Sequence, residues 1–428
     1  MEKTVTIVGL GYVGLPAACL CAEKGLQVYG LDVDKEKVDL VNKGASPIDD
    51  ECLIEKLKNL KNRINATSNP NECVPKSDVV IVCVPTPIDR NNAPDLTALM
   101  HSVSVISKVI RQNTLLVIES TIYPGTVEET VLPILKNQKF DAYKNDVFVA
   151  HCPERVDPGN KRWTIENLPR VVGGITKDAA KRAAEFYRSI IKAEVIELSS
   201  VKAAEATKIM ENTFRDVNIA FVNEMARSFD KAGIDIIEVI KGASTKPFAF
   251  MPHYPGAGVG GHCIPVDPYY LIEKAKQIGF NHRFLSLARE INNSMPHYTI
   301  DLLDNELKKS KKTIKGSKVG VLGLAYKANV DDIRESPAFE IINILKSKDA
   351  EVFVFDPHVK KESNVQDLDE LLNKSDYLIL ATDHNEFKNM DLNKLKEKKI
   401  RAVIDGRNCL DKEKIKSMGI LYHGIGRS

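Results

Sequence analysis

Residues 4–34 contain the pattern that most restricts how this chain folds: an apolar run, a glycine cluster, a helical stretch of small residues and a second apolar run. The cluster has GxGxxG spacing, and Asp32 ends the second run. In a strand, helix, strand unit Gly9 permits the turn, Gly11 lets a pyrophosphate approach the backbone, and Gly14 lets the helix pack against the strand. Asp32 would accept from ribose hydroxyls. Without a nearby arginine, this predicts a site for NAD rather than NADP.

Three later apolar runs end in polar, proline or glycine residues: "SDVVIVCVPTP", "TLLVIESTIYPGT" and "DVFVAHCPERVDPGN". Parallel strands present their C-terminal ends to a ligand crevice, so Thr86, Thr121 and Glu154 are expected to face the cofactor. The alternative is that they are turn residues that only end their strands.

The organisation of the rest of the chain indicates a repeat around a helical centre. Long helical patterns begin near Ser199, and residues from about Gly316 repeat the first region: "VTIVGLGYVG" is matched by "SKVGVLGLAYK" and "QVYGLDVD" by "EVFVFDPHV". The copy lacks the third glycine, so it is not expected to bind a second dinucleotide in the same way. We predict an α/β fold with two Rossmann-like domains, residues 1–198 and 312–428, joined by a long-helix domain, residues 199–311.

Composition excludes several classes of protein. The 428 residues carry 60 Lys and Arg against 58 Asp and Glu, a net charge of +2 without a long basic run, so no nucleic-acid partner is expected. The eight cysteines are scattered without a CxxC pair, which is typical of reduced thiols in the cytoplasm. No apolar run approaches the roughly 20 residues that span a bilayer, and no targeting segment is recognised. We expect a cytoplasmic protein with no membrane partner.

One predicted helix carries a polar stripe. Lys208, Asn212 and Arg215 are spaced i, i+4 and i+7, while apolar residues cover much of the remaining surface. This pattern predicts a buried helix whose polar stripe faces a cleft; the alternative is an ordinary solvated face.

The segment "GVGGHCIPVD" places Cys263 just before a helix that Asp267 and a proline would start. A helix N-terminus favours the thiolate, the nucleophilic form. Further Cys or His ligands are absent nearby, so no metal is expected. The spacing alone leaves a nucleophile and a buried filler both open, and it assigns no role to His262.

Taken together, several motifs resemble the nucleotide-sugar dehydrogenases over the whole chain: "GLGYVGLP", "VPTP", "EST", "CPERVDPGN", "KIMENTFRDVNIAFVNE", "GVGGHCIPVDP" and "GLAYKANVDDIRESP". The resemblance implies subunits that dimerise, or form a higher homo-oligomer, through the helical centre. It also implies NAD-dependent, four-electron oxidation of a UDP-sugar C6 alcohol to a carboxylate, in polysaccharide biosynthesis.

The resemblance further implies roles for residues. Cys263 is the nucleophile, Lys208 stabilises an oxyanion, Asn212 positions the sugar, Asp267 and Thr121 hold a water, and Glu154 assists hydrolysis. Cofactor contacts, besides the glycines, are Tyr12, Val13, Asp32, Thr86, Thr121 and Arg334. Substrate contacts are Arg155, Val156, Lys208, Asn212, Arg215, Gly260, Tyr326, Lys327 and Arg407. For Lys327 and Arg407 the alternative is plain surface charge.

The chain departs from UDP-glucose dehydrogenases at two points. Val266 stands where they usually have a lysine, and "RVDPGN" stands where they have a second glutamate. Both changes resemble the branch that oxidises N-acetylated sugars. Within it, "STKPFAFMPHYPG" resembles UDP-N-acetylglucosamine enzymes, whereas "FRDVNIAFVNE" is shared with UDP-N-acetylmannosamine enzymes. The resemblance favours the glucosamine substrate, followed by its C2 epimer and then by UDP-glucose.

Two other functions compete with this one. A hydroxyacid or 6-phosphogluconate dehydrogenase would share the N-terminal glycines, but it needs neither Cys263 nor a third domain. A nucleotide sensor without catalytic activity would keep the fold, but it has no need of Lys208 and Cys263 together.

Overall fold

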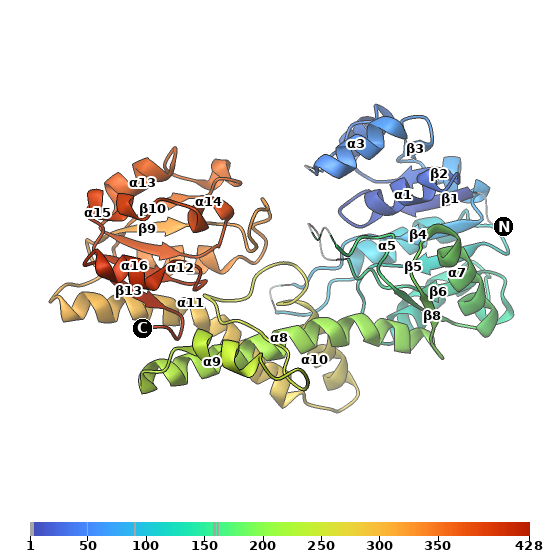
Figure 1. Cartoon of the computed structure of the whole chain (residues 1–428). Coiled ribbons are helices and arrows are strands. Elements are labelled where there is room, and N and C mark those ends of the chain that lie inside the picture. The colour runs from blue at the N-terminus through green and yellow to red at the C-terminus, as the bar shows by residue number, and fades with distance from the viewer. Residues whose placement is uncertain (1–3, 49, 90, 157–159, 161) are drawn as a thin grey trace. The chain divides into compact units, whose positions relative to one another are not determined.

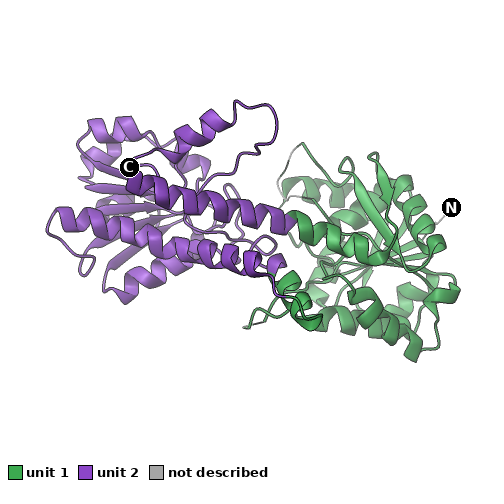
Figure 2. Ribbon diagram, turned by 90° about the horizontal axis from the view of Figure 1, so that it is seen from below, with its two compact units in different colours: residues 1–211, 269–280 green, residues 212–268, 281–428 purple. Residues whose placement is uncertain are grey.

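The computed structural model describes residues 4–48, 50–89, 91–156, 160 and 162–428. The chain folds into two compact units, and each unit is built from two separate segments of the sequence (Figure 2). Unit 1 comprises Met1–Glu211 and Tyr269–Phe280, and unit 2 comprises Asn212–Pro268 and Asn281–Ser428. These divisions do not test the predicted boundaries at residues 198 and 311, which remain a prediction.

Unit 1 is built on the first sheet, blue to green in Figure 1. Its strands are β1 (Thr4–Val8), β2 (Gln27–Leu31), β3 (Ile64–Thr67), β4 (Val79–Val82), β5 (Leu115–Ile118), β6 (Phe148–His151), β7 (Arg170–Gly174) and β8 (Val195–Glu197). Its helices are α1 (Gly14–Glu23), α2 (Lys35–Asn42), α3 (Glu51–Asn59), α4 (Pro70–Cys73), η1 (Val74–Lys76), α5 (Thr97–Ser107), η2 (Val127–Val131), α6 (Leu132–Asn137), η3 (Ala142–Lys144) and α7 (Lys177–Ile190).

The first sheet has the order β3-β2-β1-β4-β5-β6-β7-β8. Its pairs are parallel except β6 with β7, which are antiparallel. Alternate residues of β4 enter different hydrophobic clusters, Val79 and Ile81 one and Val80 and Val82 the other. Burial on both faces explains why these strands are continuous apolar runs in the sequence.

Unit 2 is built on the second sheet, orange to red in Figure 1. Its strands are β9 (Lys318–Leu322), β10 (Glu351–Phe355), β11 (Tyr377–Leu380), β12 (Ala402–Asp405) and β13 (Leu421–Gly424). Its helices are α9 (Ile236–Ala243), α11 (Arg283–Lys309), α12 (Pro337–Ser347), η4 (Lys360–Glu362), α13 (Leu368–Lys374), α14 (Asn385–Lys388), α15 (Asn393–Glu397) and α16 (Lys412–Ser417).

The second sheet is parallel, with the order β10-β9-β11-β12-β13. Strand β9 pairs with β10 and β11, as β1 pairs with β2 and β4. Gly323 follows β9 with φ +94°, and Gly9 follows β1 with φ +92°. The predicted internal repeat is therefore confirmed at the level of strand order and of the first turn.

Two helices contain residues of both units: α8 (Val201–Ala232) and α10 (Asp267–Gln277). The prediction that the apolar residues of α8 are buried all round is wrong. Met210 is 64% and Phe214 46% exposed, because α8 packs on its own chain along only part of its circumference. Among the described residues, no helix has the length and apolar character needed to cross a bilayer.

Candidate active site

The glycine turn after β1 has the geometry that a pyrophosphate requires. Gly9 adopts φ +92°, which favours glycine, and a Cβ on Gly14 would lie 1.8 Å from the Gly9 carbonyl oxygen. Gly11 is different, because no atom lies within 4 Å of the position its Cβ would take. Gly14 thus allows α1 to pack closely, while Gly11 leaves open space beside the backbone.

Asp32 follows β2 beside this turn. One carboxylate oxygen accepts from the Leu10 N–H at 2.7 Å, and the other accepts from the Asp34 N–H at 2.9 Å. The side chain is half-buried, so each oxygen keeps a lone pair for a ribose hydroxyl. Tyr12 is exposed and Val13 is half-buried at the same turn. The residues present fit NAD, and that these residues hold it remains a prediction.

Thr86 and Thr121 follow neighbouring strands and meet. The Thr86 hydroxyl donates to the Thr121 carbonyl oxygen at 2.6 Å, and the Tyr270 hydroxyl donates to the Thr86 carbonyl oxygen. Both threonines are half-buried. The structure therefore brings together two of the predicted residues at the C-terminal edge of the first sheet, while their roles remain a prediction.

Both carboxylate oxygens of the buried Glu154 accept hydrogen bonds. One carboxylate oxygen accepts from the N–H groups of Arg155 and Val156, both at 2.7 Å, and the other accepts from Arg170 at 2.7 Å. Burial alone would raise the pKa of Glu154, but the Arg170 guanidinium, these N–H groups and the charge of Lys208 outweigh burial and lower it. Glu154 is therefore a buried, ionised carboxylate with a fixed orientation.

The other predicted residues of unit 1 lie on the loop after β6 and on α8. Arg155 forms an ion pair with Glu211, with 3.1 Å between Nε and Oε2, and donates to the Pro169 carbonyl oxygen at 3.0 Å. Val156 and Lys208 are half-buried. Residues 157–159 of the "CPERVDPGN" motif lie outside the described residues.

In unit 2, the half-buried Cys263 lies in the turn that leads into α10, four residues before its first residue, Asp267. The Cys263 carbonyl oxygen accepts from the N–H groups of Val266 at 3.1 Å and Asp267 at 2.8 Å, which forms the first turn. The Asp267 carboxylate accepts from the Asn212 side-chain amide at 2.6 Å. The structure thus joins the cysteine segment to the polar stripe of α8 through two predicted catalytic residues.

The glycines before Cys263 lie against the loop after β9. A Cβ on Gly260 would lie 2.6 Å from the Cβ of Tyr326, and one on Gly261 would lie 2.8 Å from the Tyr326 ring. The Gly261 N–H donates to the Arg334 carbonyl oxygen at 2.9 Å. Lys327 is half-buried beside Tyr326. The glycines therefore permit close contact between two loops of the chain, in addition to any contact with a ligand.

The predicted arginines of unit 2 differ in their surroundings. Arg334 is exposed and forms a two-pronged ion pair with Asp332, in which NH2 lies 2.6 Å from Oδ2. Arg407 is half-buried and donates to Asp383 at 3.2 Å. Arg215 lies on the exposed surface, so the prediction that the whole stripe faces a cleft is wrong for this residue within the single chain.

Comparison with known families decides the identity. The chain matches the NAD-binding domain of the UDP-glucose/GDP-mannose dehydrogenase family over residues 3–191, the central domain over 202–294 and the UDP-binding domain over 320–412. The chain belongs to this family. It is an NAD-dependent UDP-sugar dehydrogenase.

Individual relatives cover nearly the whole dehydrogenase. A UDP-N-acetyl-D-mannosamine dehydrogenase of Methanococcus vannielii is 36% identical over 99% of this chain and 97% of its own. A UDP-N-acetyl-D-glucosamine 6-dehydrogenase of Pseudomonas aeruginosa is 37% identical over 96% and 98%. The solved structure of a UDP-D-ManNAc dehydrogenase from Pyrococcus horikoshii matches with a TM-score of 0.93 and 35% identity, over 99% of each chain.

Sequence reasoning missed the buried partners of Glu154 in the dehydrogenase. Arg170 also lies 3.5 Å from Glu119, which accepts from the Tyr187 hydroxyl at 2.5 Å. Burial raises the pKa of Glu119 more than Arg170 lowers it, so the same guanidinium contacts two carboxyl groups whose pKa values are shifted in opposite directions. Arg170 lies 16 residues from Glu154 and 51 from Glu119, and no local spacing marks the three as a group.

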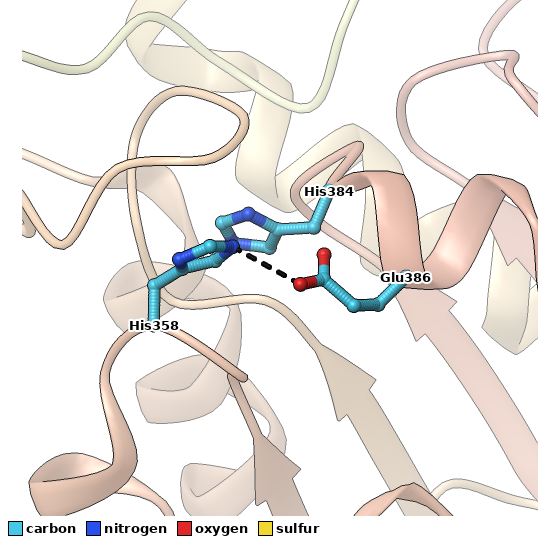
Figure 3. Close-up of side chains that lie close together, drawn as sticks. All are labelled: His358, His384 and Glu386. Atoms are coloured by element: carbon cyan, nitrogen blue, oxygen red, sulfur yellow. Dashed lines mark ion pairs between the residues drawn. The ribbon is translucent and has the colours of Figure 1, made fainter.

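One cluster among the described residues has the composition of a metal site: His358, His384 and Glu386 (Figure 3). His358 Nε2 lies 3.4 Å from Glu386 Oε1. His384 is fully buried, and both of its ring nitrogens are hydrogen bonded, one to Asp356 and one to the Asn329 N–H, each at 2.9 Å. His384 therefore has no nitrogen left for a metal, and two side chains alone do not make a closed site.

Proposed function

We propose that the dehydrogenase oxidises the C6 alcohol of a UDP-N-acetylhexosamine to the uronic acid, with UDP-N-acetyl-D-glucosamine as the preferred substrate. The observation that carries this proposal is the placement of Cys263. The cysteine is half-buried in the turn that leads into α10, four residues before the first residue of this helix, an aspartate that is hydrogen bonded to Asn212. A helix N-terminus favours the thiolate, and the Asn212 bond fixes the first turn of that helix.

The reaction has two oxidations around one covalent intermediate. NAD supplies the chemistry of accepting a hydride from carbon. After the alcohol loses a hydride and a proton, the Cys263 thiolate adds to the aldehyde carbon and forms a thiohemiacetal. Loss of a second hydride and proton gives a thioester, and water releases the carboxylate and the free thiol. The cysteine is needed because the trigonal aldehyde becomes tetrahedral only after a nucleophile adds.

The chain's own residues handle charge and protons in this scheme. Lys208 stabilises the oxygen that becomes negative when the thiolate adds. Asp267 and Thr121 hold the water that takes the alcohol proton, and Glu154, kept ionised by Arg170, accepts a proton from the water that attacks the thioester. Asn212 orients both Asp267 and the sugar.

The choice of sugar rests on residues near the cysteine. Val266 is buried beside Asp267, at the position where UDP-glucose dehydrogenases usually have a lysine. The segment "STKPFAFMPHYPG" supports the glucosamine substrate. The mannosamine epimer is the second candidate, because "FRDVNIAFVNE" resembles its enzymes and relatives carrying both names are 36–37% identical to this chain.

The subunits are proposed to form a homodimer through the long helices. Large apolar side chains on α8 and α11 stay between 46% and 67% exposed in the single chain: Met210, Phe214, Phe221, Phe284 and Leu287. Exposed apolar side chains gathered on two helices are typical of a surface that another protein covers. A mass measurement in solution by light scattering tests this, and a monomer at micromolar concentration would contradict it.

A spectrophotometric screen tests the function. Purified enzyme with NAD is given UDP-glucose, UDP-N-acetylglucosamine, UDP-N-acetylgalactosamine and UDP-N-acetylmannosamine in separate reactions, and NADH release is followed. The proposal predicts the highest kcat/KM for UDP-N-acetylglucosamine. Preference for the mannosamine epimer would correct the sugar only, whereas NAD binding without turnover of any UDP-sugar would support a nucleotide sensor.

A further inference from the structure

We propose that His384 is a positioning residue for substrate binding: it fixes the loop of residues 323–329, and thereby Tyr326 and Lys327, for the nucleotide part of the substrate. The inference rests on the proposed function, because it assumes that this loop contacts a UDP-sugar. His384 follows β11, far from the loop in sequence, and it carries no role in the reaction described above.

The loop is attached to the ends of two neighbouring strands. Asp356, which follows β10, accepts from the N–H groups of Leu324 at 2.6 Å and Ala325 at 2.9 Å. His384 accepts from the Asn329 N–H at 2.9 Å, at the other end of the loop. Tyr326 and Lys327 lie between these two attachments. The segment that carries both side chains is therefore held on each side.

The two hydrogen bonds of His384 determine which tautomer its imidazole ring adopts. Because the Asn329 N–H donates to Nδ1, this nitrogen carries no proton. Nε2 therefore carries the proton and donates to Asp356 at 2.9 Å. Only a ring with one acceptor and one donor fits both partners. The same ring thus links the two attachments of the loop to each other.

Comparison with the first sheet shows how Asp356 differs from its counterpart Asp32. Asp32 and Asp356 each follow the strand beside the glycine turn, and each accepts from the N–H two residues after the preceding strand, Leu10 or Leu324. Asp32 is half-buried, whereas Asp356 is completely buried. The second Asp356 oxygen accepts from the N–H groups of His358 and Val359. Both oxygens of the Asp356 carboxylate are already occupied by hydrogen bonds within the protein, so it cannot accept from a ribose. In the second sheet this aspartate instead holds the loop of residues 323–329.

Tyr326 connects the loop of residues 323–329 to the segment that precedes Cys263. Its side chain lies so close to Gly260 and Gly261 that a Cβ on either glycine would be within 2.6–2.8 Å of it. A shift of the loop would therefore move Lys327 and also disturb the backbone before Cys263. The His384 contacts affect how substrate binds without requiring His384 itself to touch the substrate.

Two substitutions at His384 each remove one of its two hydrogen bonds and keep the other. His384→Asn keeps an acceptor near the Nδ1 position for Asn329, and His384→Gln keeps a donor near the Nε2 position for Asp356. His358→Gln is the matched control, because this neighbouring ring stacks on His384 with 4.7 Å between centroids and bonds to Glu386. Kinetic constants for UDP-sugar and NAD are measured for all three variants, with hydrogen exchange of the peptide spanning residues 324–332.

We expect His384→Gln to raise the KM for UDP-sugar about fivefold, the effect of one lost net hydrogen bond, with the KM for NAD unchanged. Exchange in residues 324–332 should accelerate. His384→Asn keeps the Asn329 bond but loses the donor to Asp356, so it should show a smaller rise, and His358→Gln should stay near wild type in both measurements. An unchanged KM in His384→Gln together with unchanged exchange would overturn the proposal, as would a similar rise in His358→Gln.

Two measurements do not depend on turnover. Exchange in the wild type must show a protected Asn329 amide although the residue is exposed; exchange at the rate of a free amide would overturn the proposal even if the variants fail to fold. If the wild type oxidises no UDP-sugar, the proposed function fails. Calorimetry with UDP then decides this inference: a higher Kd in His384→Gln than in wild type supports it, and an equal Kd or no binding contradicts it.

Discussion

The side-chain amide of Asn212 on α8 donates to the Asp267 carboxylate at the start of α10, over 2.6 Å, and both side chains are buried. A buried carboxylate needs its hydrogen bonds, because in their absence the cost of taking it out of water is not offset. This bond ties the helix that begins after Cys263 to the long helix that carries Lys208.

Asn212→Ala should lower both stability and activity, because it removes a donor to buried Asp267. We expect a loss of about 1–3 kcal/mol in the free energy of unfolding, measured by urea denaturation, and a fall in kcat. Asn218→Ala is the control, since the Asn218 amide bonds to the Phe214 carbonyl of the same helix. Equal effects of the two substitutions would argue against a special role of the Asn212 bond.

Asp32→Ala should weaken NAD binding. The carboxylate is a charged acceptor, and the loss of its ribose hydrogen bonds costs about 1.5–3 kcal/mol, which is roughly a 10- to 150-fold rise in the Kd for NAD. Calorimetric titration measures it. Asp39→Ala removes an exposed carboxylate on α2 and should leave the Kd unchanged; if Asp32→Ala behaves like it, Asp32 does not hold the ribose.

Arg170→Met should destabilise the protein in a pH-dependent way. It leaves the Glu154 carboxylate buried without its countercharge, at a cost of about 3–5 kcal/mol near neutral pH. In the wild type Arg170 keeps the folded-state pKa of Glu154 below its ordinary value, so this carboxylate contributes stability above its unfolded pKa, and the contribution is lost as pH falls through the folded pKa.

Without Arg170, burial prevails and the folded-state pKa of Glu154 rises above the unfolded value. The variant's stability should then fall with increasing pH, so that its deficit against wild type is small near pH 4 and largest at about pH 8. Thermal melts across this range measure the difference. Arg188→Met, which breaks an exposed ion pair with Glu197, should cost less than about 1 kcal/mol at any pH. A pH-independent deficit in Arg170→Met would contradict the assignment of charges.

Glu205 on α8 should give the stability a further pH dependence. Its carboxylate accepts from the N–H groups of Gly125 at 2.5 Å and Val127 at 2.8 Å, but burial prevails over these bonds and raises its pKa to about 7. The folded state then binds the proton more tightly than the unfolded state, so stability falls as pH rises from the unfolded pKa to about 7.

The amide side chain in Glu205→Gln cannot ionise, so the variant should lose this contribution to the pH dependence of stability. Melting temperatures between about pH 5 and pH 8 should therefore depend less on pH in Glu205→Gln than in wild type. Glu185→Gln, at an exposed position of α7, should keep the wild-type slope. Parallel curves for wild type and Glu205→Gln would show that Glu205 does not titrate in this range.

The fold could be predicted from the sequence where local chemistry repeats. Gly9 and Asp32 mark the first turn and the end of β2, and the same pattern with Asp356 predicts the second sheet. The antiparallel step from β6 to β7 could not be predicted, because both strands are short apolar runs and such a run carries no signal of the direction in which its strand pairs.

In the candidate site too, some residues could be predicted from the sequence and others could not. Cys263 and Asp267 stand close together in the sequence beside glycines, so they could be recognised. Arg170 and His384 act through buried contacts with residues far away in the chain, and their neighbours in sequence give no spacing that points to those contacts. The exposure of Phe214 also escaped prediction, because helical periodicity cannot distinguish a face buried in the chain from one left for a partner.

The most direct test of the account is the ratio of NADH formed to UDP-N-acetylglucosamine consumed, with the sugar limiting and NAD in excess. Cys263 as the nucleophile of a four-electron oxidation predicts two NADH for each sugar, with a uronic acid as the product by mass spectrometry. Cys263→Ser should fall far below wild type in turnover. One NADH for each sugar with an aldehyde or ketone as the final product, or a Cys263→Ser enzyme that turns over like wild type, would contradict it.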